Sequence, residues 1–527
     1  MHWVDVYAGE LLERGKKHVI ASGTSISGLI HIGNAGDIII ADALARAVRD
    51  AGGEATVLWI MDDLDPLRSV PKEMPQEFAR HLGKPDAHLP CPFGHCQSFT
   101  EHFTRDFMRS LRQIGVSPVI VSEAERYKAG AYDEEVRTAI KSAGEIRRIL
   151  KDISGAERPE DWLPFDPICG NCGRIITTQA DGFDGERVHY VCKGGVAGKR
   201  EIKGCGHEGS AGIRDGKLTW RVQWAARWRR LGVTCEPFGK EHAAAGGSYD
   251  TCSAIVRDVF HYPSPHPIKY EHIMIGGKKM SKSVGNVITL QQLIDVATPE
   301  AARFFFFRTK ANVHKDFSME NSVLPLVEDY EQAERVYFGK EEAFSEKEAP
   351  DIKRGYELAQ VDKVPDAFSQ VKYRHLLFVV QAGGDWEGTK RILSRGGYLE
   401  GVTPDGEARL AVKAAAADRW VRTHAPEQMR FKLAETPPEI MIAPEEINAL
   451  KVLSGVLKDV KWEAGTIHDS VHGVGEKAGV PPKVVFQSLY KVLLGSERGP
   501  RLGYFLEALD REFVLERVGH FLVGPKD

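Results

Sequence analysis

Apolar and polar residues follow a strand, helix, strand order near the start of the chain. Residues 18–21 and 55–60 are short, mostly apolar runs that are typical of buried strands. Between them, residues 35–50 repeat their apolar positions with the period of a helix, and Gly52-Gly53 follows as a helix-ending signal. This order predicts a βαβ unit of a parallel sheet.

A second helix and a further strand extend the same pattern. One apolar face is formed by aromatic and aliphatic residues four positions apart, namely Phe99, Phe103, Phe107 and Leu111. Residues 119–121 then form another short apolar run. We therefore predict an α/β fold with a doubly wound, Rossmann-type parallel sheet, which is a common scaffold for nucleotide binding.

The pattern of apolar and polar residues changes at two later points, near residue 166 and near residue 320. Residues 166–216 are rich in Gly and Cys and have few apolar periods, which predicts a small inserted module stabilised by something other than a core. Beyond about residue 320 amphipathic helical segments follow one another, at 324–337, 408–424 and 482–494, and the charged stretch 341–366 is expected to hold a loop between helices. The expected domains are 1–165 and 217–320 for the two halves of the sheet domain, 166–216 for the module and 321–527 for an all-α domain.

Composition narrows the class of protein. A chain of 527 residues with 42% hydrophobic and 27% charged residues is expected to be folded and soluble. The first residues lack a basic stretch followed by an apolar one, and no apolar run reaches the length of a membrane span, so we expect a cytoplasmic protein without a membrane partner. Residues 187–230 hold eleven Lys and Arg against three Asp and Glu, which is typical of a nucleic-acid contact or of a solvated basic surface.

Six of the eight cysteines fall in two clusters that predict metal sites. Cys91, His95, Cys96 and His102 supply four N or S ligands, although two unrelated thiols beside surface histidines would give the same pattern. In the module, Cys169 and Cys172 form a Cys-x-x-Cys turn, and Cys192 and Cys205 complete a four-thiolate set, with His207 as an alternative to Cys205. We expect two structural zinc ions, because four protein ligands leave no open coordination position.

Two loops carry groups suited to phosphates. The first strand runs through Gly28 to His31, Gly33 and Asn34, where a helix N-terminus and glycines let a phosphate approach the backbone. His31 is then a candidate donor to a phosphate oxygen, or a structural histidine beside a turn. Residues 276–286 form the second loop, a glycine-flanked run with three lysines that suits a polyphosphate or simply forms a basic surface loop.

Together, in this order, the two loops resemble the two signatures of class I aminoacyl-tRNA synthetases. Residues 279–283 match the second signature in full, whereas the first ends in Asn34 where histidine is usual. Asn34 can donate a hydrogen bond but carries no charge. Residues 62–68, 239–250 and 499–503 further resemble the lysyl-tRNA synthetases of this class.

The resemblance implies ATP and L-lysine as substrates, Mg²⁺ with the ATP, a lysine-accepting tRNA as partner and a helical anticodon-binding domain at the C-terminus. We favour a monomer. The implied catalytic residues are His31, Asn34, Lys279 and Lys282. The implied ATP-binding residues are Gly28, Gly33, Gly36, Lys279, Met280, Ser281 and Lys282. The implied lysine pocket contains Gly28, Ile30, Trp220, His242 and Tyr270.

Several assignments stay open at this stage. Asp62, Asp63 or Asp65 is the expected partner of the substrate ammonium, because a buried cation needs pairing, but each could instead cap a helix or turn. Trp220 and Tyr270 could be core aromatics. Arg221, Arg227, Arg229 and Arg230 are candidates for tRNA phosphates. The rival functions are a class I synthetase for glutamate, cysteine or arginine, and a synthetase-like RNA-binding or amino-acid-sensing protein without catalysis.

Overall fold

The computed structural model describes residues 1–72, 74–280, 285–434 and 436–522. The chain folds into two compact units. Unit 1 contains Met1–Gln292, Ala302–Phe317 and Glu342–Lys363. Unit 2 contains Leu293–Ala301, Ser318–Glu341 and Val364–Asp527.

Unit 1 is built on a five-stranded parallel sheet in the order β12-β11-β1-β2-β3. The strands are β1 (Lys17–Thr24), β2 (Glu54–Met61), β3 (Val119–Ser122), β11 (Cys235–Gly239) and β12 (His266–Tyr270). The order runs outward from β1 in both directions, so a switch of direction lies between β1 and β11. In such sheets the crevice at the carboxyl ends of the strands, at the switch, is where ligands bind.

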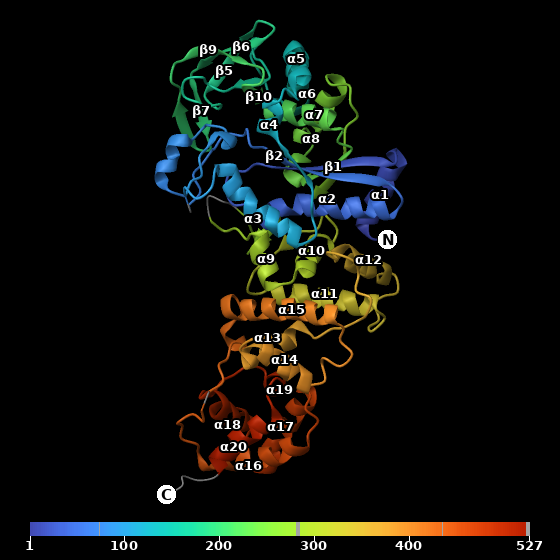
Figure 1. Ribbon diagram of the computed structural model, residues 1–527, viewed down its shortest axis with the longest axis vertical. Coiled ribbons are helices and arrows are strands. Elements are labelled where there is room, and N and C mark those ends of the chain that lie inside the picture. Colours follow the sequence, from blue (N-terminus) through green and yellow to red (C-terminus); the bar gives the residue numbers. More distant parts are fainter. Residues whose placement is uncertain (73, 281–284, 435, 523–527) are drawn as a thin grey trace. The chain divides into compact units, whose positions relative to one another are not determined.

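Helices cover both faces of this sheet (Figure 1). The helices before the module are α1 (Trp3–Arg14), α2 (Ile32–Asp50), α3 (Phe99–Gln113), α4 (Glu123–Lys128), α5 (Asp133–Lys141) and α6 (Ala143–Ser154). After the module come α7 (Trp220–Leu231), α8 (Ser248–Asp258), α9 (Leu290–Val296) and α10 (Pro299–Phe307). Leu58 and Ile60 pack in one core cluster with residues of α7 and α8, whereas Trp59, which points the opposite way, packs against the ring of Phe107 of α3 at a tilt of 51°. The doubly wound prediction is confirmed.

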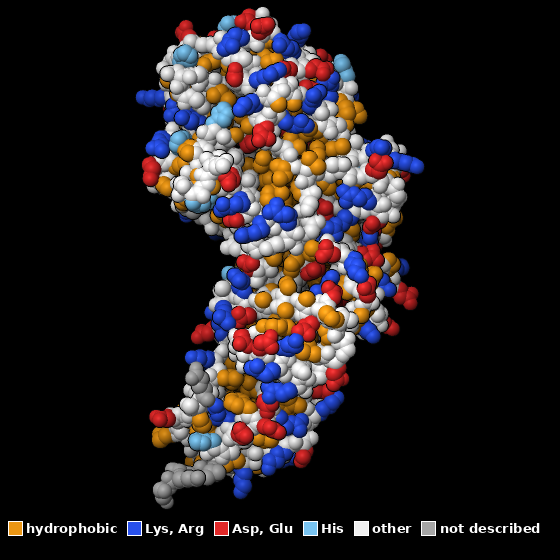
Figure 2. Space-filling model, viewed as in Figure 1, with side chains coloured by type: hydrophobic (Ala, Val, Ile, Leu, Met, Phe, Trp, Pro, Cys, Tyr) orange, Lys and Arg blue, Asp and Glu red, His pale blue; other side chains and the backbone are white. Residues whose placement is uncertain are grey.

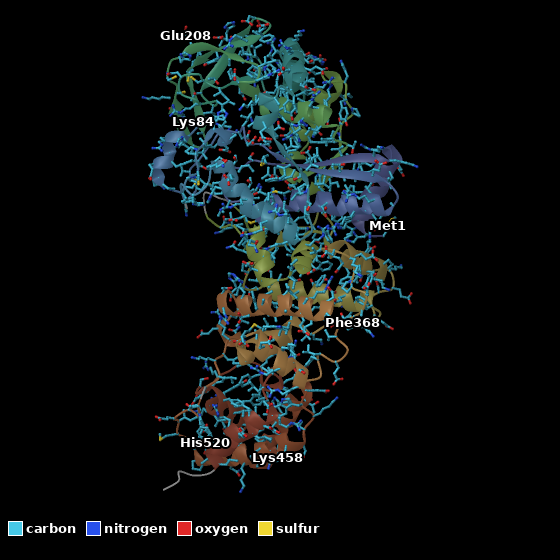
Figure 3. All side chains as sticks on the ribbon, in the orientation of Figure 1. Met1, Lys84, Glu208, Phe368, Lys458 and His520 are labelled. Carbon is cyan, nitrogen blue, oxygen red and sulfur yellow. The ribbon has the colours of Figure 1, made fainter. Side chains whose placement is uncertain are left out.

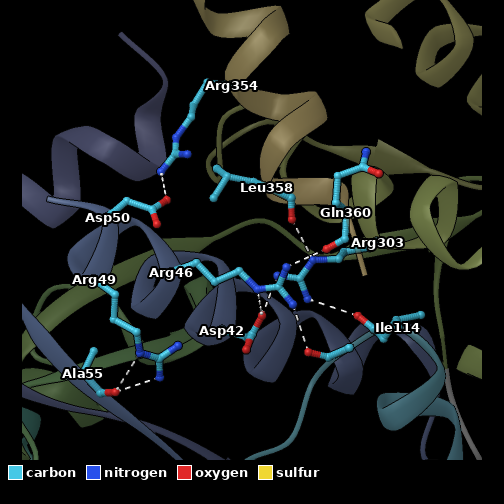
Figure 4. Close-up of polar contacts among 11 residues, drawn as sticks. Asp42, Arg46, Arg49, Asp50, Ala55, Ile114, Arg303, Arg354, Leu358 and Gln360 are labelled. Atoms are coloured by element: carbon cyan, nitrogen blue, oxygen red, sulfur yellow. Dashed lines mark hydrogen bonds and ion pairs between the residues drawn. The ribbon is translucent and has the colours of Figure 1, made fainter. Parts of the chain in front are cut away.

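A buried ion network fixes α2 within unit 1 (Figure 4). Arg303 is fully buried, pairs with Asp42 of α2, and donates to the carbonyl of Leu358 at 2.7 Å. Arg46, one turn along α2, also bonds Asp42 and donates to the carbonyl of Gln360 at 2.6 Å. These bonds tie α2 to α10 and to the end of α12 (Ala349–Ala359). They therefore hold the helix whose first turn carries the expected phosphate loop.

The inserted module leaves and rejoins the sheet domain through a paired stem. Strand β4 (Phe165–Pro167) pairs antiparallel with β10 (Gly216–Leu218), so the excursion begins and ends at one place. The module contains β5 (Thr178–Phe183), β6 (Arg187–Cys192), β7 (Gly194–Ala197), β8 (Arg200–Lys203) and β9 (Glu208–Gly212). A small buried cluster beside these strands has two thiols among its four buried members, which are Cys169, Cys192, Tyr190 and Ala211.

The remaining described strands and helices complete both units. The short strands β13 (Ile273–Ile275), β14 (Lys278–Lys279) and β15 (Lys315–Asp316) form a separate small sheet in unit 1. The later helices are α11 (Val323–Tyr337), α12, α13 (Tyr373–Gly383), α14 (Trp386–Arg395), α15 (Pro404–Thr423), α16 (Pro444–Asp459), α17 (Ala464–Ala478), α18 (Pro482–Leu494), α19 (Leu502–Glu507) and α20 (Arg511–Leu522). Beyond β15 the described residues contain helices and no strand, as predicted.

The stretch 341–366 holds a helix as well as the loop expected there. Helix α12 lies inside that stretch and begins with a proline in its first turn, where the missing N–H costs nothing. The segment Glu342–Lys363 also returns to unit 1, so the helical part of the chain is interrupted relative to the expected 321–527 domain.

On the displayed face, acidic and basic side chains are interspersed over each unit (Figure 2). Among the described residues, no helix is both long enough and apolar enough to cross a membrane.

Candidate active site

A cavity of about 560 Å³ lies at the carboxyl ends of the parallel strands in unit 1. Its wall includes Thr24 at the end of β1, Asp62 just after β2, Gly239 at the end of β11 and Tyr270 at the end of β12. The first turn of α2 contributes Gly33 and Asn34. The cavity therefore occupies the crevice that a doubly wound sheet offers to a ligand.

The expected phosphate loop lies at the N-terminus of α2. His31 is the N-cap residue, its side chain makes no cap hydrogen bond, and the first turn contains no acidic residue. No carboxylate in the first turn therefore neutralises the positive end of the helix dipole. At Gly33 a Cβ would lie 2.9 Å from the His31 ring and 3.1 Å from the end of Met280, so only glycine fits between the two signature segments.

The flank of the second signature packs directly on the first. Ile32 donates its backbone N–H to the carbonyl of Ile288 at 2.8 Å, and His31 forms an isolated bridge with Thr289. Lys279 and Met280 both line the cavity. Ser281, Lys282 and Ser283 lie outside the described residues.

Lys279 is paired with a carboxylate in this structure. Its Nζ lies 3.2 Å from Glu241 Oε1 and 3.3 Å from His272 Nε2, and His272 in turn lies 3.1 Å from Glu241 Oε2. Burial lowers the pKa of His272, which favours the neutral imidazole. Burial acts to raise the pKa of Glu241, but a backbone hydrogen bond and the charge of Lys279 outweigh burial, so that the pKa is lowered.

Aromatic rings form one wall. Trp220 stacks on Trp224 with ring centroids 5.5 Å apart, and His242 meets each indole edge-on at 5.5 Å. Burial lowers the pKa of His242, which favours its neutral form. Trp220 keeps 44% of its surface exposed, so it is no core residue, and its ring is open to a ligand.

Not every residue expected at the site lines the cavity. Gly28 and Ile30 are buried beneath the loop and are absent from the cavity wall. Gly36 faces Phe306, where a Cβ would make an ordinary contact at 3.7 Å. His31, Gly33, Asn34, Trp220, His242, Tyr270, Lys279 and Met280 are brought together.

The three aspartates expected to bind an ammonium are already engaged. Asp62 pairs with buried Arg227 at 2.7 Å. Asp65 pairs with buried Lys217 and accepts from Ser25 at 2.8 Å. Asp63 accepts from Ser122 and from the backbone N–H of Ala124, outside the cavity wall. Arg227 and Lys217, which are distant in sequence, thus pair with Asp62 and Asp65 in the cavity wall, whereas Asp63 accepts only from neutral groups.

The arginines expected to meet tRNA phosphates differ among themselves. Arg227 is buried against Asp62, and Arg229 pairs with Glu134 and Glu135 at 2.6 and 2.5 Å. Neither is available to a phosphate. Arg221 donates to Ser154 Oγ at 3.0 Å, and Arg230 is exposed.

Asp37, which the sequence reasoning missed, offers a carboxylate to the cavity. It lies on α2 one turn after Asn34, and its Oδ1 is buried without a hydrogen-bond partner among the described residues. Burial raises its pKa well above the usual value, and the carboxylates of Glu236 and Glu241 raise it further. Glu236 itself accepts from the indoles of Trp224 and Trp228 at 3.0 and 2.5 Å. A cation beside Asp37 would relieve this cost.

Both cysteine clusters assemble as the sequence predicted. In each, the four ligand atoms lie within 4.8 Å of one another. In the module, Cys169 and Cys205 have sulfurs 3.6 Å apart, and Cys172 and Cys192 have sulfurs 3.8 Å apart. In the first cluster, His95 Nε2 and His102 Nδ1 are 3.2 Å apart. Cys205 belongs to the module's set and His207 does not. Lys84, labelled in Figure 3, packs its aliphatic chain on Gly173 beside the Cys-x-x-Cys turn.

Known families account for nearly all of the chain. A family model described as tRNA synthetases class I (K) matches residues 1–362, and an anticodon binding domain matches residues 423–522. The chain therefore belongs to the class I aminoacyl-tRNA synthetases.

Within that class its relatives are lysine–tRNA ligases. The Lysine–tRNA ligase of Methanosphaera stadtmanae is 37% identical over 98% of both chains. That of Archaeoglobus fulgidus is 40% identical over 98% of this chain and 99% of its own. Among solved structures, a glutamate tRNA ligase from Elizabethkingia meningosepticum aligns over 97% of this chain and 100% of its own, at 15% identity and a TM-score of 0.40, too distant to guide assignments.

Proposed function

We propose that the chain is an ATP-dependent lysine–tRNA ligase. It activates L-lysine to lysyl-adenylate with release of pyrophosphate, and then transfers lysine to the 2′-hydroxyl of the terminal adenosine of its tRNA. The family match and the full-length relatives support the reaction. The alternatives for glutamate, cysteine or arginine and the non-catalytic alternative have no comparable support.

The single observation that carries the choice of lysine within this cavity is the carboxylate of Asp37, whose buried Oδ1 has no partner in the part of the chain that the structure describes. Every other acidic group on the cavity wall has a cation, an indole or a hydroxyl as partner. An ammonium brought to Asp37 gains a full charge pair inside a cavity walled by Trp220 and His242, whose rings pack against its aliphatic chain. The α-carboxylate would then face the α-phosphorus of ATP.

Phosphate handling falls to the two signatures. The N-terminus of α2 with Gly33, His31 and Asn34 offers N–H donors to the phosphates of ATP. Lys279 and Lys282 supply cationic charge as pyrophosphate leaves, so that positioning and charge stabilisation carry the acceleration. Magnesium bound with ATP would neutralise part of the phosphate charge.

The cysteine clusters are proposed to hold two structural zinc ions. Tetrahedral Zn²⁺ with Zn–S bonds of about 2.3 Å separates its sulfurs by about 3.8 Å, and Zn–N bonds of about 2.0 Å separate nitrogens by about 3.3 Å. The observed separations of 3.6, 3.8 and 3.2 Å fit both geometries. The metal would replace the core that the module lacks.

A monomer in the cytoplasm is the accompanying proposal.

Pyrophosphate exchange tests the proposed function. The protein is assayed with each of the twenty amino acids, with and without tRNA. Exchange stimulated by lysine supports the proposal, and exchange stimulated by glutamate, cysteine or arginine with lysine inert refutes the choice of substrate. Absence of exchange under every condition refutes the reaction.

A further inference from the structure

Glu241 lies between the two charged groups that the proposed function assigns to different substrates. Its Oε1 is 3.2 Å from the ammonium nitrogen of Lys279 on β14. Burial is the main cause of the raised pKa of Asp37, and Glu241 is one of the two carboxylates that raise it further. All three side chains line the cavity. One carboxylate therefore acts both on the cation assigned to the phosphates and on the anion assigned to the substrate ammonium.

The backbone on each side of this ion pair is fixed by other contacts. Lys240, next to Glu241 in the single turn after β11, pairs with Glu271 at 2.6 Å. The turn between β13 and β14 is held by Asp316, which accepts from the backbone N–H of Gly277 at 2.8 Å. The lysine of the pair has a flexible four-carbon stem, so its ammonium can leave the carboxylate while both backbone segments stay in place.

The ion pair is exposed and therefore easily exchanged. The side chain of Lys279 keeps 58% of its surface exposed, and that of Glu241 keeps 43%. Ion pairs this exposed favour the paired state by a factor of only about 2 to 5. The triphosphate of ATP carries several negative charges and attracts the ammonium more strongly than one carboxylate does.

His272 can hold the carboxylate after the ammonium has left. Its Nε2 lies 3.1 Å from Glu241 Oε2 and 3.3 Å from Lys279 Nζ. One ring nitrogen of a neutral imidazole either donates or accepts, so it serves only one of these partners at a time. Once the ammonium is on the phosphates, an Nε2–H can donate to the carboxylate and keep it in the cavity wall. Because this donor is neutral, the negative charge of Glu241 is then left uncompensated.

We propose that Glu241 is an exchangeable counterion that couples the binding of ATP to the binding of lysine. Without ATP it pairs with Lys279. When Lys279 turns to the phosphates, the charge of Glu241 adds to that of Asp37 and attracts the substrate ammonium. Glu241 is thus a positioning residue that acts on ATP through Lys279. The inference rests on the proposed function and assigns a regulation to the same site.

The coupling is measured by equilibrium binding to the full-length protein with tRNA present. The probes are L-lysine and α,β-methylene ATP, in which a P–C–P bridge replaces the bond that breaks when pyrophosphate leaves. Each Kd is determined with and without a saturating amount of the other ligand. In the wild type each ligand should lower the Kd of the other by about 2- to 5-fold. Linkage requires the same factor in both directions.

Glu241→Gln keeps the size of the side chain and removes its charge. Without lysine present, this variant should bind the ATP analogue about 2- to 5-fold more tightly than the wild type, because Lys279 is no longer held by a carboxylate. The coupling between the two ligands should disappear. Loss of a merely structural contact would instead weaken binding of the analogue or leave it unchanged.

Two further variants separate this role from a general effect of charge. In a Lys279→Ala background, Glu241→Gln should leave the Kd of the analogue unchanged, because its effect passes through Lys279. Glu10→Gln is the matched control: Glu10 has 47% of its side chain exposed and pairs with His266 at 2.9 Å, at the amino end of β12. This control should bind both ligands, and couple them, like the wild type.

Three results would overturn the inference. They are independent binding of the two ligands by the wild type, coupling that persists in Glu241→Gln, and equal tightening of the analogue by Glu241→Gln when Lys279 is absent. The third result would mean that Glu241 simply repels the phosphates.

Failure of the proposed function gives a different result. In that case the wild-type protein shows no lysine-dependent pyrophosphate exchange. Lysine-dependent exchange by the wild type together with uncoupled binding leaves the function standing and removes only the role of Glu241.

Discussion

Replacing Asp37 by Asn tests how the cavity selects a cationic side chain. The change keeps the size of the residue and removes one negative charge. Losing one partner of a buried charge pair costs about 3 to 5 kcal/mol. Glu236 and Glu241 stay close enough to raise the pKa of Asp37, so part of the negative potential survives in the variant. We therefore expect a free-energy cost at the lower end of this range, about 3 kcal/mol. This cost corresponds to roughly a 150-fold fall in kcat/KM for lysine.

The assay is pyrophosphate exchange with tRNA present, in which lysine and ATP are varied separately. KM for ATP should stay within about threefold of wild type, since Asp37 is assigned to the ammonium and not to the phosphates. Norleucine, which lacks the ammonium, provides the matched comparison: the wild-type preference for lysine over norleucine should shrink in the variant. An unchanged kcat/KM for lysine, or an equal loss for both amino acids, would refute the assignment.

Further outcomes follow from the same structure. As pH falls through the raised pKa of Asp37 the carboxylate becomes neutral, so kcat/KM for lysine should fall toward acid, and Asp37→Asn should flatten that limb of the profile. Lys282→Ala should slow adenylate formation by on the order of 10²-fold or more with tRNA affinity retained, and the neighbouring Lys278→Ala is its control. Zinc analysis should give about two ions per chain, and Cys172→Ser should lose one of them together with thermal stability. Arg303→Ala should lower the free energy of unfolding by about 3 to 5 kcal/mol in denaturant titration, because Asp42 is left buried without its main partner.

The central strands of the sheet domain were predictable because β1 and β2 are largely buried. Such strands appear in sequence as short apolar runs, and the helix between β1 and β2 keeps a clear period, so local pattern sufficed. The cysteine clusters were predictable for another reason. Each cluster contains ligands three or four residues apart, Cys91 with His95 and Cys169 with Cys172, which constrains part of its geometry locally. The module's lack of apolar periods also indicated the need for a metal.

The charge pairs of the cavity were not predictable in this way. Asp62 and Asp65 were free candidates in sequence, but their partners Arg227 and Lys217 approach from chain segments more than 150 residues away. One feature of the sequence could have indicated Asp37 as a site residue. It is an isolated acid between Gly36 and three consecutive isoleucines, in a helix whose other face had to be buried. A charge retained there at a cost in solvation suggests a ligand.

Helix α12 shows a second limit of prediction from the local sequence. Proline and a high density of charge predicted a loop within 341–366 and gave no sign of the helix beside it, in which the proline occupies a first-turn position and the apolar face buries Tyr356 and Leu358. Contacts between segments distant in sequence decided the outcome there, and local composition carried no information about them.

The most direct test of the central claim is amino-acid-dependent ATP–pyrophosphate exchange by the wild-type protein in the presence of its tRNA. The account predicts exchange with lysine and little with the other nineteen amino acids. Exchange driven by glutamate, cysteine or arginine while lysine is inert would contradict it.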